Sequence, residues 1–320
     1  MMAGYTGNCG GGGKVATLMQ SPAADGLFHR AIMMSGSGLQ GSRPRVDREI
    51  ALSMLRYLHM DSIDELQKDP LKDFIAATNA AFKETEGKKE SVLDALRFEL
   101  TPNDTYKGEA ILVGLREHAK QIPLMIGNVF AEFNMRAVMP NKRHASESEI
   151  HAYLSEIFEE ATDRIIEEFK KAYPQKSLGD LGALDHIFRP PTIALADLRA
   201  KDHCSNTYVH MNAFEAPQDD GLPIWHCGDL DFLFHSAELS PIHQIPGYTS
   251  EFQEKVFTGF MTFAKTGNPN NELIPNWPEY KMGSEYTMMF DKTIEPRLDY
   301  DRELMADVAK YRHHDTLIDF

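Results

Sequence analysis

The sequence predicts an α/β fold, in which a mostly parallel sheet is flanked by helices. A helix over residues 10–20 is followed by a short apolar strand over 29–34, and further buried strands are expected at 122–127 and 207–211. A helix followed by a strand is one step of a parallel sheet, because the crossover returns the chain to the same end of the sheet. Strands spread in this way, with helical segments between them, indicate the α/β class.

The turn at residues 7–11, Gly-Asn-Cys-Gly-Gly, is the central feature of the sequence. It fits the pattern G-x-S-x-G of a nucleophile elbow, the sharp strand-to-helix turn that holds a catalytic side chain above a sheet. Gly7 and Gly11 occupy the two glycine positions, and Cys9 occupies the position of the nucleophile. A Cβ at either glycine is expected to collide across the turn, which explains why glycine is needed there.

Two other interpretations of the glycine run are weaker. The four consecutive glycines at 10–13 would suit a flexible loop, but residues 14–20 continue as a helix. A phosphate-binding loop requires G-x-x-x-x-G-K-[ST], whereas Val15 follows Lys14 and Asn8 occupies the first glycine position. The run therefore opens a helix, and its extra glycines are expected to let that helix pack closely on the sheet.

Apolar spacing predicts the other helices. Apolar side chains recur at helical intervals over 46–58, 147–172 and 250–265. Another helix is expected from Pro70, a good first-turn residue, to about residue 83. The charged, glycine-interrupted stretch 84–90 is expected to be a solvated loop.

Composition limits the classes of function that the chain can perform. Its 320 residues, 42% of them hydrophobic, are enough for the core of one large domain. The formal net charge of −15 argues against nucleic acid or an anionic membrane as a main partner. No apolar run reaches the roughly eighteen residues of a membrane span, and the first residues lack the features of a signal peptide. Three cysteines, a sparse and odd set, indicate reduced thiols and a cytoplasmic protein.

Longer motifs carry a family resemblance. Residues 21–32 read S-P-A-A-D-G-L-F-H-R-A-I, and residues 35–37 read S-G-S. Together with the elbow, this segment closely resembles the region around the active serine of the type B carboxylesterases, which have the α/β-hydrolase fold. Residues 264–270 and 277–280 also match, in a structural role. The resemblance covers nearly the whole chain, but it matches only the C-terminal portion of such enzymes.

The resemblance implies one partial α/β-hydrolase domain over residues 1–320, whose N-terminal strands are missing. Helical insertions are expected at roughly 40–120 and 145–200. Residues 1–6 are expected to be only the tail of a strand. The missing strands leave a sheet edge and a core face uncovered, which is expected to encourage self-association.

The resemblance also supplies a catalytic triad in the chain order nucleophile, acid, histidine. Glu132 ends a match to the family segment P-L-x-x-G-x-x-x-x-E, in which the glutamate is the acid, although Phe133 stands where most members have glycine. His226 fits the histidine of the pattern G-A-x-H-x-x-[DE]-[IL], with Asp229 at the acidic position. The match is better after this histidine than before it. The chain contains 13 histidines, and His210, His235, His313 and His314 have no such context.

Two further residues receive supporting roles from the resemblance. The backbone N–H of Gly10 is expected to be one donor of the oxyanion hole, because the residue after the nucleophile supplies it in this fold. Ser35 matches a family serine that hydrogen-bonds near the acid. No metal or other cofactor is expected, since the pair His226 and Cys227 has no second pair at ligand spacing.

The predicted function is hydrolysis of a small-molecule carboxylic ester through an acyl-enzyme, with cysteine in place of serine. A cysteine at the start of a helix and beside a histidine should have a lowered pKa and be a good nucleophile. Two departures keep an alternative open. The HGGG-type segment that completes the oxyanion hole is missing, and a site shaped for oxygen can accept sulfur poorly. The alternative is a catalytically impaired or non-catalytic esterase-like binding module, or a truncated gene product.

Overall fold

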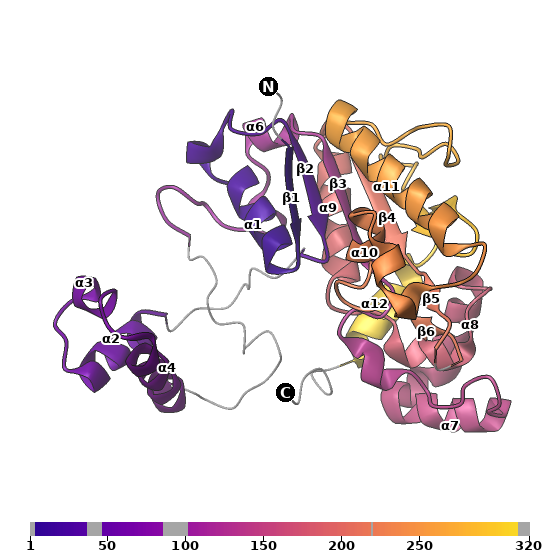
Figure 1. The fold of residues 1–320 in the computed structure, drawn as a ribbon, viewed down its shortest axis with the longest axis horizontal. Helices are drawn as coiled ribbons and strands as arrows, with labels where there is room; N and C mark the ends of the chain where they lie inside the picture. Colours follow the sequence, from indigo (N-terminus) through magenta and orange to yellow (C-terminus); the bar gives the residue numbers. More distant parts are fainter. Residues whose placement is uncertain (1–3, 37–46, 86–101, 219, 313–320) are drawn as a thin grey trace. The chain divides into compact units, whose positions relative to one another are not determined.

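The computed structural model describes residues 4–36, 47–85, 102–218 and 220–312. The chain divides into two compact units, shown in Figure 1. The larger unit consists of Met1–Gln40 and Pro102–Phe320, and the smaller unit is Gly41–Thr101. From residue 86 onward, the stretch expected to be a solvated loop lies outside the described residues.

The larger unit contains a sheet whose described strands follow the order β1-β2-β3-β4-β7-β8. Strands β1 to β4 and β7 are parallel, and β8 pairs with β7 in the antiparallel direction. A separate antiparallel pair joins β5 to β6. The strands are β1 Gly4–Asn8, β2 Arg30–Met34, β3 Leu124–Val129, β4 Thr207–Asn212, β5 Glu215–Ala216, β6 Leu222–Pro223, β7 Tyr286–Phe290 and β8 Glu295–Leu298. This arrangement confirms the predicted mostly parallel sheet.

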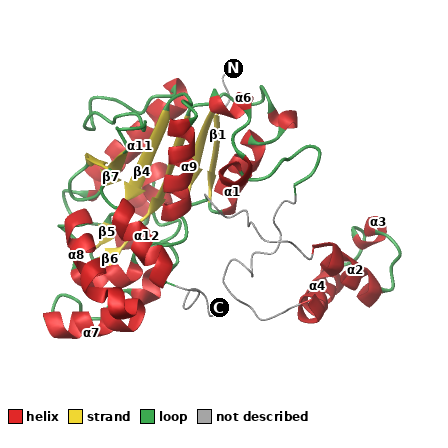
Figure 2. Ribbon diagram, turned by 180° about the vertical axis from the view of Figure 1, so that it is seen from behind, coloured by secondary structure: helices red, strands yellow, loops and turns green. Residues whose placement is uncertain are grey.

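Helices pack on both faces of this sheet. On one face, α1 and α9 bury side chains such as Val15 and Leu195 against Ile126 of β3, and α9 lies in front of the sheet in Figure 2. On the other face, α11 contributes Phe260 and Phe263 to a separate hydrophobic cluster, which is the larger of the two. The helices of the larger unit are α1 Gly10–Met19, α5 Ala110–Val113, α6 Glu117–Lys120, α7 Glu147–Phe158, α8 Thr162–Ala172, α9 Arg189–Lys201, α10 Leu230–Leu233, α11 Thr249–Thr266 and α12 Arg302–Tyr311.

The described part of the smaller unit is helical, with α2 Asp47–Leu58, α3 Ile63–Leu66 and α4 Leu71–Thr85. Ile50 and Met54 of α2 pack with Ala77 and Ala81 of α4 in a small core of their own. The helices predicted at 46–58 and from Pro70 to about 83 are therefore confirmed. In the ranges that the structure describes, no helix is both long and apolar enough to cross a membrane.

The glycines of the elbow differ in whether the surrounding backbone leaves space for a side chain. A Cβ on Gly7 would lie 2.2 Å from the carbonyl carbon of Gly11, so the predicted collision is confirmed there. The prediction is wrong for Gly11, because a Cβ built on it meets no atom within 4 Å. A Cβ on Gly12 would lie 2.8 Å from Cα of Gly36, which follows β2. Of the extra glycines, Gly12 therefore gives the expected close packing, whereas Gly10 faces open space.

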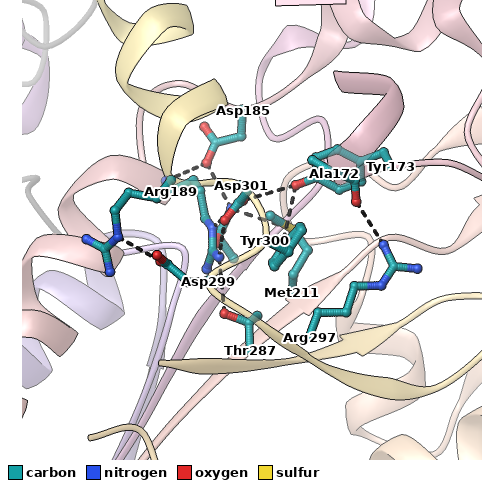
Figure 3. A network of polar contacts seen from close by, with 12 residues as sticks. Ala172, Tyr173, Asp185, Arg189, Met211, Thr287, Arg297, Asp299, Tyr300 and Asp301 are labelled. Carbon is teal, nitrogen blue, oxygen red and sulfur yellow. Dashed lines mark hydrogen bonds and ion pairs between the residues drawn. The ribbon is translucent and has the colours of Figure 1, made fainter. Parts of the chain in front are cut away.

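A buried ion pair fixes the beginning of α9 to the C-terminal part of the sheet (Figure 3). The guanidinium of Arg189 donates to Asp301 Oδ1 at 2.7 Å and to the hydroxyl of Thr287, in β7, at 3.1 Å. Both side chains of the pair are 2% exposed. The hydroxyl of Tyr173 donates to Asp301 Oδ2 at 3.2 Å. The first residue of α9 is thus held by β7 and by the residue preceding α12.

Candidate active site

Cys9 lies in the turn between β1 and α1. Its backbone has φ 54° and ψ −126°, a strained combination typical of a nucleophile elbow. Its N–H donates to the carbonyl oxygen of Met34 at 3.0 Å, and its carbonyl oxygen accepts from the N–H of Gly13 at 3.1 Å. The half-buried side chain is therefore presented at the carboxyl end of the parallel strands.

Glu132 follows β3 by three residues, at the same edge of the sheet. Its side chain is completely buried, at 0% exposed. Oε1 accepts a hydrogen bond of 2.6 Å from the hydroxyl of Ser35 and one of 2.9 Å from the backbone N–H of Val129. Oε2 lies 2.5 Å from Nδ1 of His226. The structure thus places the three sequence-predicted residues Ser35, Glu132 and His226 in one chain of hydrogen bonds.

His226 is held next to Glu132 by backbone as well as side-chain contacts. Its N–H donates to the carbonyl oxygen of Glu132 at 3.0 Å, and the N–H of Ala131 donates to the carbonyl oxygen of Ile224 at 3.0 Å. The segments after β3 and after β6 therefore run side by side. Nε2 of His226 is buried and has no hydrogen-bond partner among the described residues. The imidazole nevertheless interacts with the Cys9 thiol closely enough to lower its pKa, so it contacts both the acid and the thiol.

Two phenyl rings pack against this imidazole. The ring centroid of Phe133 lies 4.1 Å from that of His226, with an angle of 32° between the planes. The ring of Phe188 lies 5.4 Å away and nearly parallel, at 13°. Phe133 and Phe188 also contact each other, with centroids 5.9 Å apart. The three rings form a cluster that limits the rotation of the imidazole.

The electrostatic surroundings favour a charged thiol. The contact with His226 is the main cause that lowers the pKa of Cys9, and burial acts in the opposite direction. The N–H of Gly10 also lowers this pKa, by a hydrogen bond to the sulfur. The lowered pKa predicted for Cys9 is confirmed, with the histidine rather than the helix terminus as the larger cause.

Burial has the opposite effect on the acids. It raises the pKa of Glu132 to about 8, although the hydrogen bonds from Ser35 and Val129 lower this pKa. Burial also raises the pKa values of Asp185 and Asp229 to about 7, and the charge of Glu132 adds to both shifts. Burial therefore disfavours ionisation of all three carboxyl groups, and a negative charge on Glu132 further disfavours charge on its two acidic neighbours.

Sequence reasoning missed several residues around the site. Asp185 accepts hydrogen bonds from the backbone N–H groups of Ile187, Phe188 and Arg189 at the beginning of α9. It thereby fixes the backbone of Phe188, whose ring contacts the imidazole. An aspartate a few residues before Pro190 is a known signal for a helix start and could have revealed this element. The role of the Phe188 ring has no such signal.

Two other described histidines, His210 and His235, lie outside the site. His210 is buried in β4 among the rings of Phe260 and Trp277, and burial lowers its pKa to about 3. His235 forms a half-exposed pair with Glu254 at 2.9 Å. His313 and His314 lie outside the described residues.

Comparison with known proteins identifies the class. The sequence profile of the Carboxylesterase family matches residues 5–307, so the chain belongs to this family. Para-nitrobenzyl esterase of Bacillus subtilis is 27% identical over 308 residues, which are 93% of this chain and 60% of that protein. Cocaine esterase of Homo sapiens is 23% identical over 310 residues, which are 88% of this chain and 53% of that protein.

Solved structures agree with the family and the fold. An esterase from anaerobic Clostridium hathewayi, described as able to hydrolyze aliphatic aromatic polyesters, superposes with a TM-score of 0.84 at 36% identity. The similarity covers 96% of this chain and 61% of that one. The predicted α/β-hydrolase fold is confirmed. The chain spans about 60% of the length of the Bacillus relative.

Proposed function

We propose that this chain hydrolyses carboxylic esters through an acyl-enzyme formed on Cys9. The observation that carries the proposal is the position of His226, whose imidazole contacts Glu132 on one side and the Cys9 thiol on the other. This order of contacts is that of a nucleophile, a proton carrier and an orienting acid. Membership of the Carboxylesterase family supports an ester as the substrate.

In the proposed mechanism, the Cys9 sulfur attacks the carbonyl carbon of the ester. His226 accepts the proton of the thiol, whose pKa is lowered by that contact. The tetrahedral intermediate collapses, the carbon–oxygen bond to the alcohol breaks, and His226 protonates the leaving alkoxide. A thioester remains on Cys9. His226 then takes a proton from water, whose oxygen attacks the thioester carbonyl. The carbon–sulfur bond breaks, the carboxylic acid leaves, and the proton on His226 returns to the Cys9 sulfur.

Three other groups support these steps. Glu132 holds Nδ1–H of the imidazole, which selects the tautomer and stabilises the charged form. Ser35 fixes the opposite carboxylate oxygen of Glu132. The N–H of Gly10, which already donates to the sulfur, is proposed as one donor to the oxyanion.

For the substrate, we propose esters of aromatic carboxylic acids as the first class to examine. The Clostridium esterase supports this choice, since it is the solved relative with 36% identity and its description names aliphatic aromatic polyesters. A soluble diester of terephthalic acid with an aliphatic alcohol is a suitable small representative.

The test compares the purified chain with its Cys9→Ala and Cys9→Ser variants on a short-chain aryl ester. We expect repeated turnover by the native chain and only background hydrolysis by Cys9→Ala. Mass spectrometry of the quenched reaction should show one acyl group on the peptide that contains Cys9. Equal rates for all three proteins would contradict the catalytic proposal and favour an esterase-like binding module.

A histidine pair elsewhere in the chain provides the matched control. His235 and Glu254 form a histidine–carboxylate contact of 2.9 Å that is half-exposed and outside the site. His226→Ala should abolish turnover, because no other described group bridges the thiol and the acid. His235→Ala should leave turnover unchanged. A similar loss in both variants would indicate a general effect on folding.

A further inference from the structure

A second thiol lies beside the proposed nucleophile. Cys227 directly follows His226, and its thiol donates a hydrogen bond of 3.2 Å to Oδ1 of Asn8. Asn8 directly precedes Cys9 at the end of β1. The side-chain contact therefore joins the two segments that carry the cysteines. Cys227 is exposed, so its sulfur is accessible from solvent.

The pKa values of the two thiols are shifted in opposite directions. His226 lowers the pKa of Cys9. Burial raises the pKa of Cys227 to about 11, and the negative charge of Cys9 is the next cause. Cys9 is therefore the thiol that ionises first, while Cys227 keeps its proton. An ionised thiol next to a protonated one is the arrangement of redox-sensitive cysteine pairs, in which the first is oxidised and the second resolves the product.

The third cysteine lacks these relationships and serves as an internal comparison. Cys204 follows α9, and its N–H donates to the carbonyl oxygen of Arg199 at 2.9 Å. Burial raises its pKa, and the charged groups that act on it are Arg199, Asp202, Lys120 and Glu117. Neither Cys9 nor Cys227 is among them.

We propose that Cys9 and Cys227 form a reversible disulfide when the protein meets a peroxide. The Cys9 thiolate attacks one oxygen of hydrogen peroxide, the O–O bond breaks, and hydroxide leaves and takes up a proton to become water. The resulting sulfenic acid is then attacked by the sulfur of Cys227. Its S–O bond breaks, and the thiol proton joins the departing hydroxide as a second water. The two thiols lose two electrons, and the peroxide gains them.

The disulfide removes the nucleophile and so switches hydrolysis off. This consequence rests on the proposed function, whereas the covalent chemistry does not. A dithiol reductant returns both thiols by exchange through a mixed disulfide. The pair also protects Cys9, because a sulfenic acid that has become a disulfide does not proceed to the irreversible sulfinic acid.

The experiment exposes the reduced full chain to hydrogen peroxide and maps its peptides without reduction. We expect a crosslinked peptide pair containing Cys9 and Cys227, and a fall from three titratable thiols to one. Dithiothreitol should restore all three thiols. The Cys204→Ser variant should form the same crosslink. Sulfinic acid on Cys9 without the crosslink, or a disulfide that includes Cys204, would overturn the proposal.

A second variant and a chemical probe test the same pair, so that the conclusion does not depend on the Cys204→Ser variant alone. In Cys227→Ser, peroxide should leave a sulfenic acid on Cys9 that dimedone captures, and prolonged exposure should give a product that dithiothreitol does not reverse. Phenylarsine oxide, which binds two adjacent thiols, should protect Cys9 and Cys227 of the reduced chain from alkylation but leave Cys204 reactive. Independent alkylation of all three thiols in its presence would contradict the pairing.

These readouts separate the two proposals. A crosslink in a chain that hydrolyses no ester would support the redox pair and contradict the esterase. Ester turnover in a chain that forms no crosslink would do the reverse.

Discussion

The phenyl ring of Phe133 packs on the imidazole of His226, with ring centroids 4.1 Å apart and planes inclined at 32°. Phe133 directly follows Glu132, so one turn supplies both the acid and a ring that restrains the base. In the family pattern that the sequence resembles, most members have glycine at this position. A departure from the family pattern thus contributes a contact to the centre of the site.

Replacing Phe133 with alanine should reduce kcat/KM for an aryl ester. An aromatic pair of this kind contributes about 0.5–1.5 kcal/mol beyond its buried area, so the loss should be roughly 2- to 12-fold. Phe133→Tyr, which keeps the ring, should restore most of the activity. Phe257 is the matched control, since it is also a half-buried phenylalanine that contacts a histidine, His235. If Phe257→Ala lowers kcat/KM equally, the contact with His226 is not the cause.

Ser35→Ala should move the acidic limb of the pH–rate profile to higher pH. The hydrogen bond from Ser35 lowers the pKa of Glu132, so its removal raises that pKa above its value of about 8. Glu132 must be ionised to hold Nδ1–H of His226, and a higher pH is then needed to ionise it. The profile of kcat/KM against pH measures this shift. Ser155→Ala, which removes an exposed serine bonded within α7, should leave the profile in place.

His226→Asn should slow the alkylation of Cys9 by iodoacetamide near neutral pH. The contact with His226 is the main cause of the lowered pKa of Cys9, so its loss raises that pKa and decreases the thiolate fraction. Peptide mass mapping at several pH values should show the inflection at higher pH than in the native chain. His235→Asn should not change the rate. Unchanged alkylation in His226→Asn would refute the assigned contact.

Arg189→Met should strongly destabilise the larger unit. Removing one member of a buried pair leaves Asp301 as a buried charge without its counterpart, at a cost of about 3–5 kcal/mol. Arg302 gives the contrast, because its contact with Asp197 is about one-third exposed, at 37% for both side chains. Arg302→Met should cost about 0–1 kcal/mol. Urea denaturation followed by circular dichroism measures both, and equal losses would contradict the distinction.

The two glycines of the elbow should respond differently to alanine. Gly7→Ala brings a Cβ to 2.2 Å from the carbonyl of Gly11, so the backbone must shift, at a cost of about 1–3 kcal/mol and with loss of activity. Gly11→Ala meets no atom within 4 Å and lies in α1. It should be tolerated, and helix propensity favours it by roughly 0.5–1 kcal/mol. Thermal melts and ester hydrolysis of the two variants test this difference.

Much of the fold could be predicted from local patterns. Helices α2, α4, α7, α8 and α11 have apolar stripes or a proline at the start, and β2, β3 and β4 are short apolar runs. Helix α9 was not predicted as an element of its own. Charged Arg189 and Arg199 are among its buried residues, so its buried face does not appear as a stripe of apolar residues. Strand β8 contains Pro296 and is only partly buried, so it lacks the usual alternation of a strand.

The site was predictable to a different extent. Cys9, Glu132 and His226 could be proposed because each lies in a motif with a fixed spacing, and Ser35 followed from the same resemblance. The contacts of Phe188 and Cys227 could not, because they depend on which segments the sheet brings together. No pattern along the chain relates Cys227 to Asn8, although their side chains share a hydrogen bond.

The location of the smaller unit has a consequence for how such chains diversify. β2 and β3 are direct neighbours, paired from Ala31 and Leu124 to Met34 and Gly127, although Gly41–Thr101 lies between them in sequence. The ladder fixes their alignment, and the entropy of closing the intervening segment grows only logarithmically with its length. The segment between β2 and β3 can therefore be replaced by another, through recombination or grafting, without changing the strand order of the sheet.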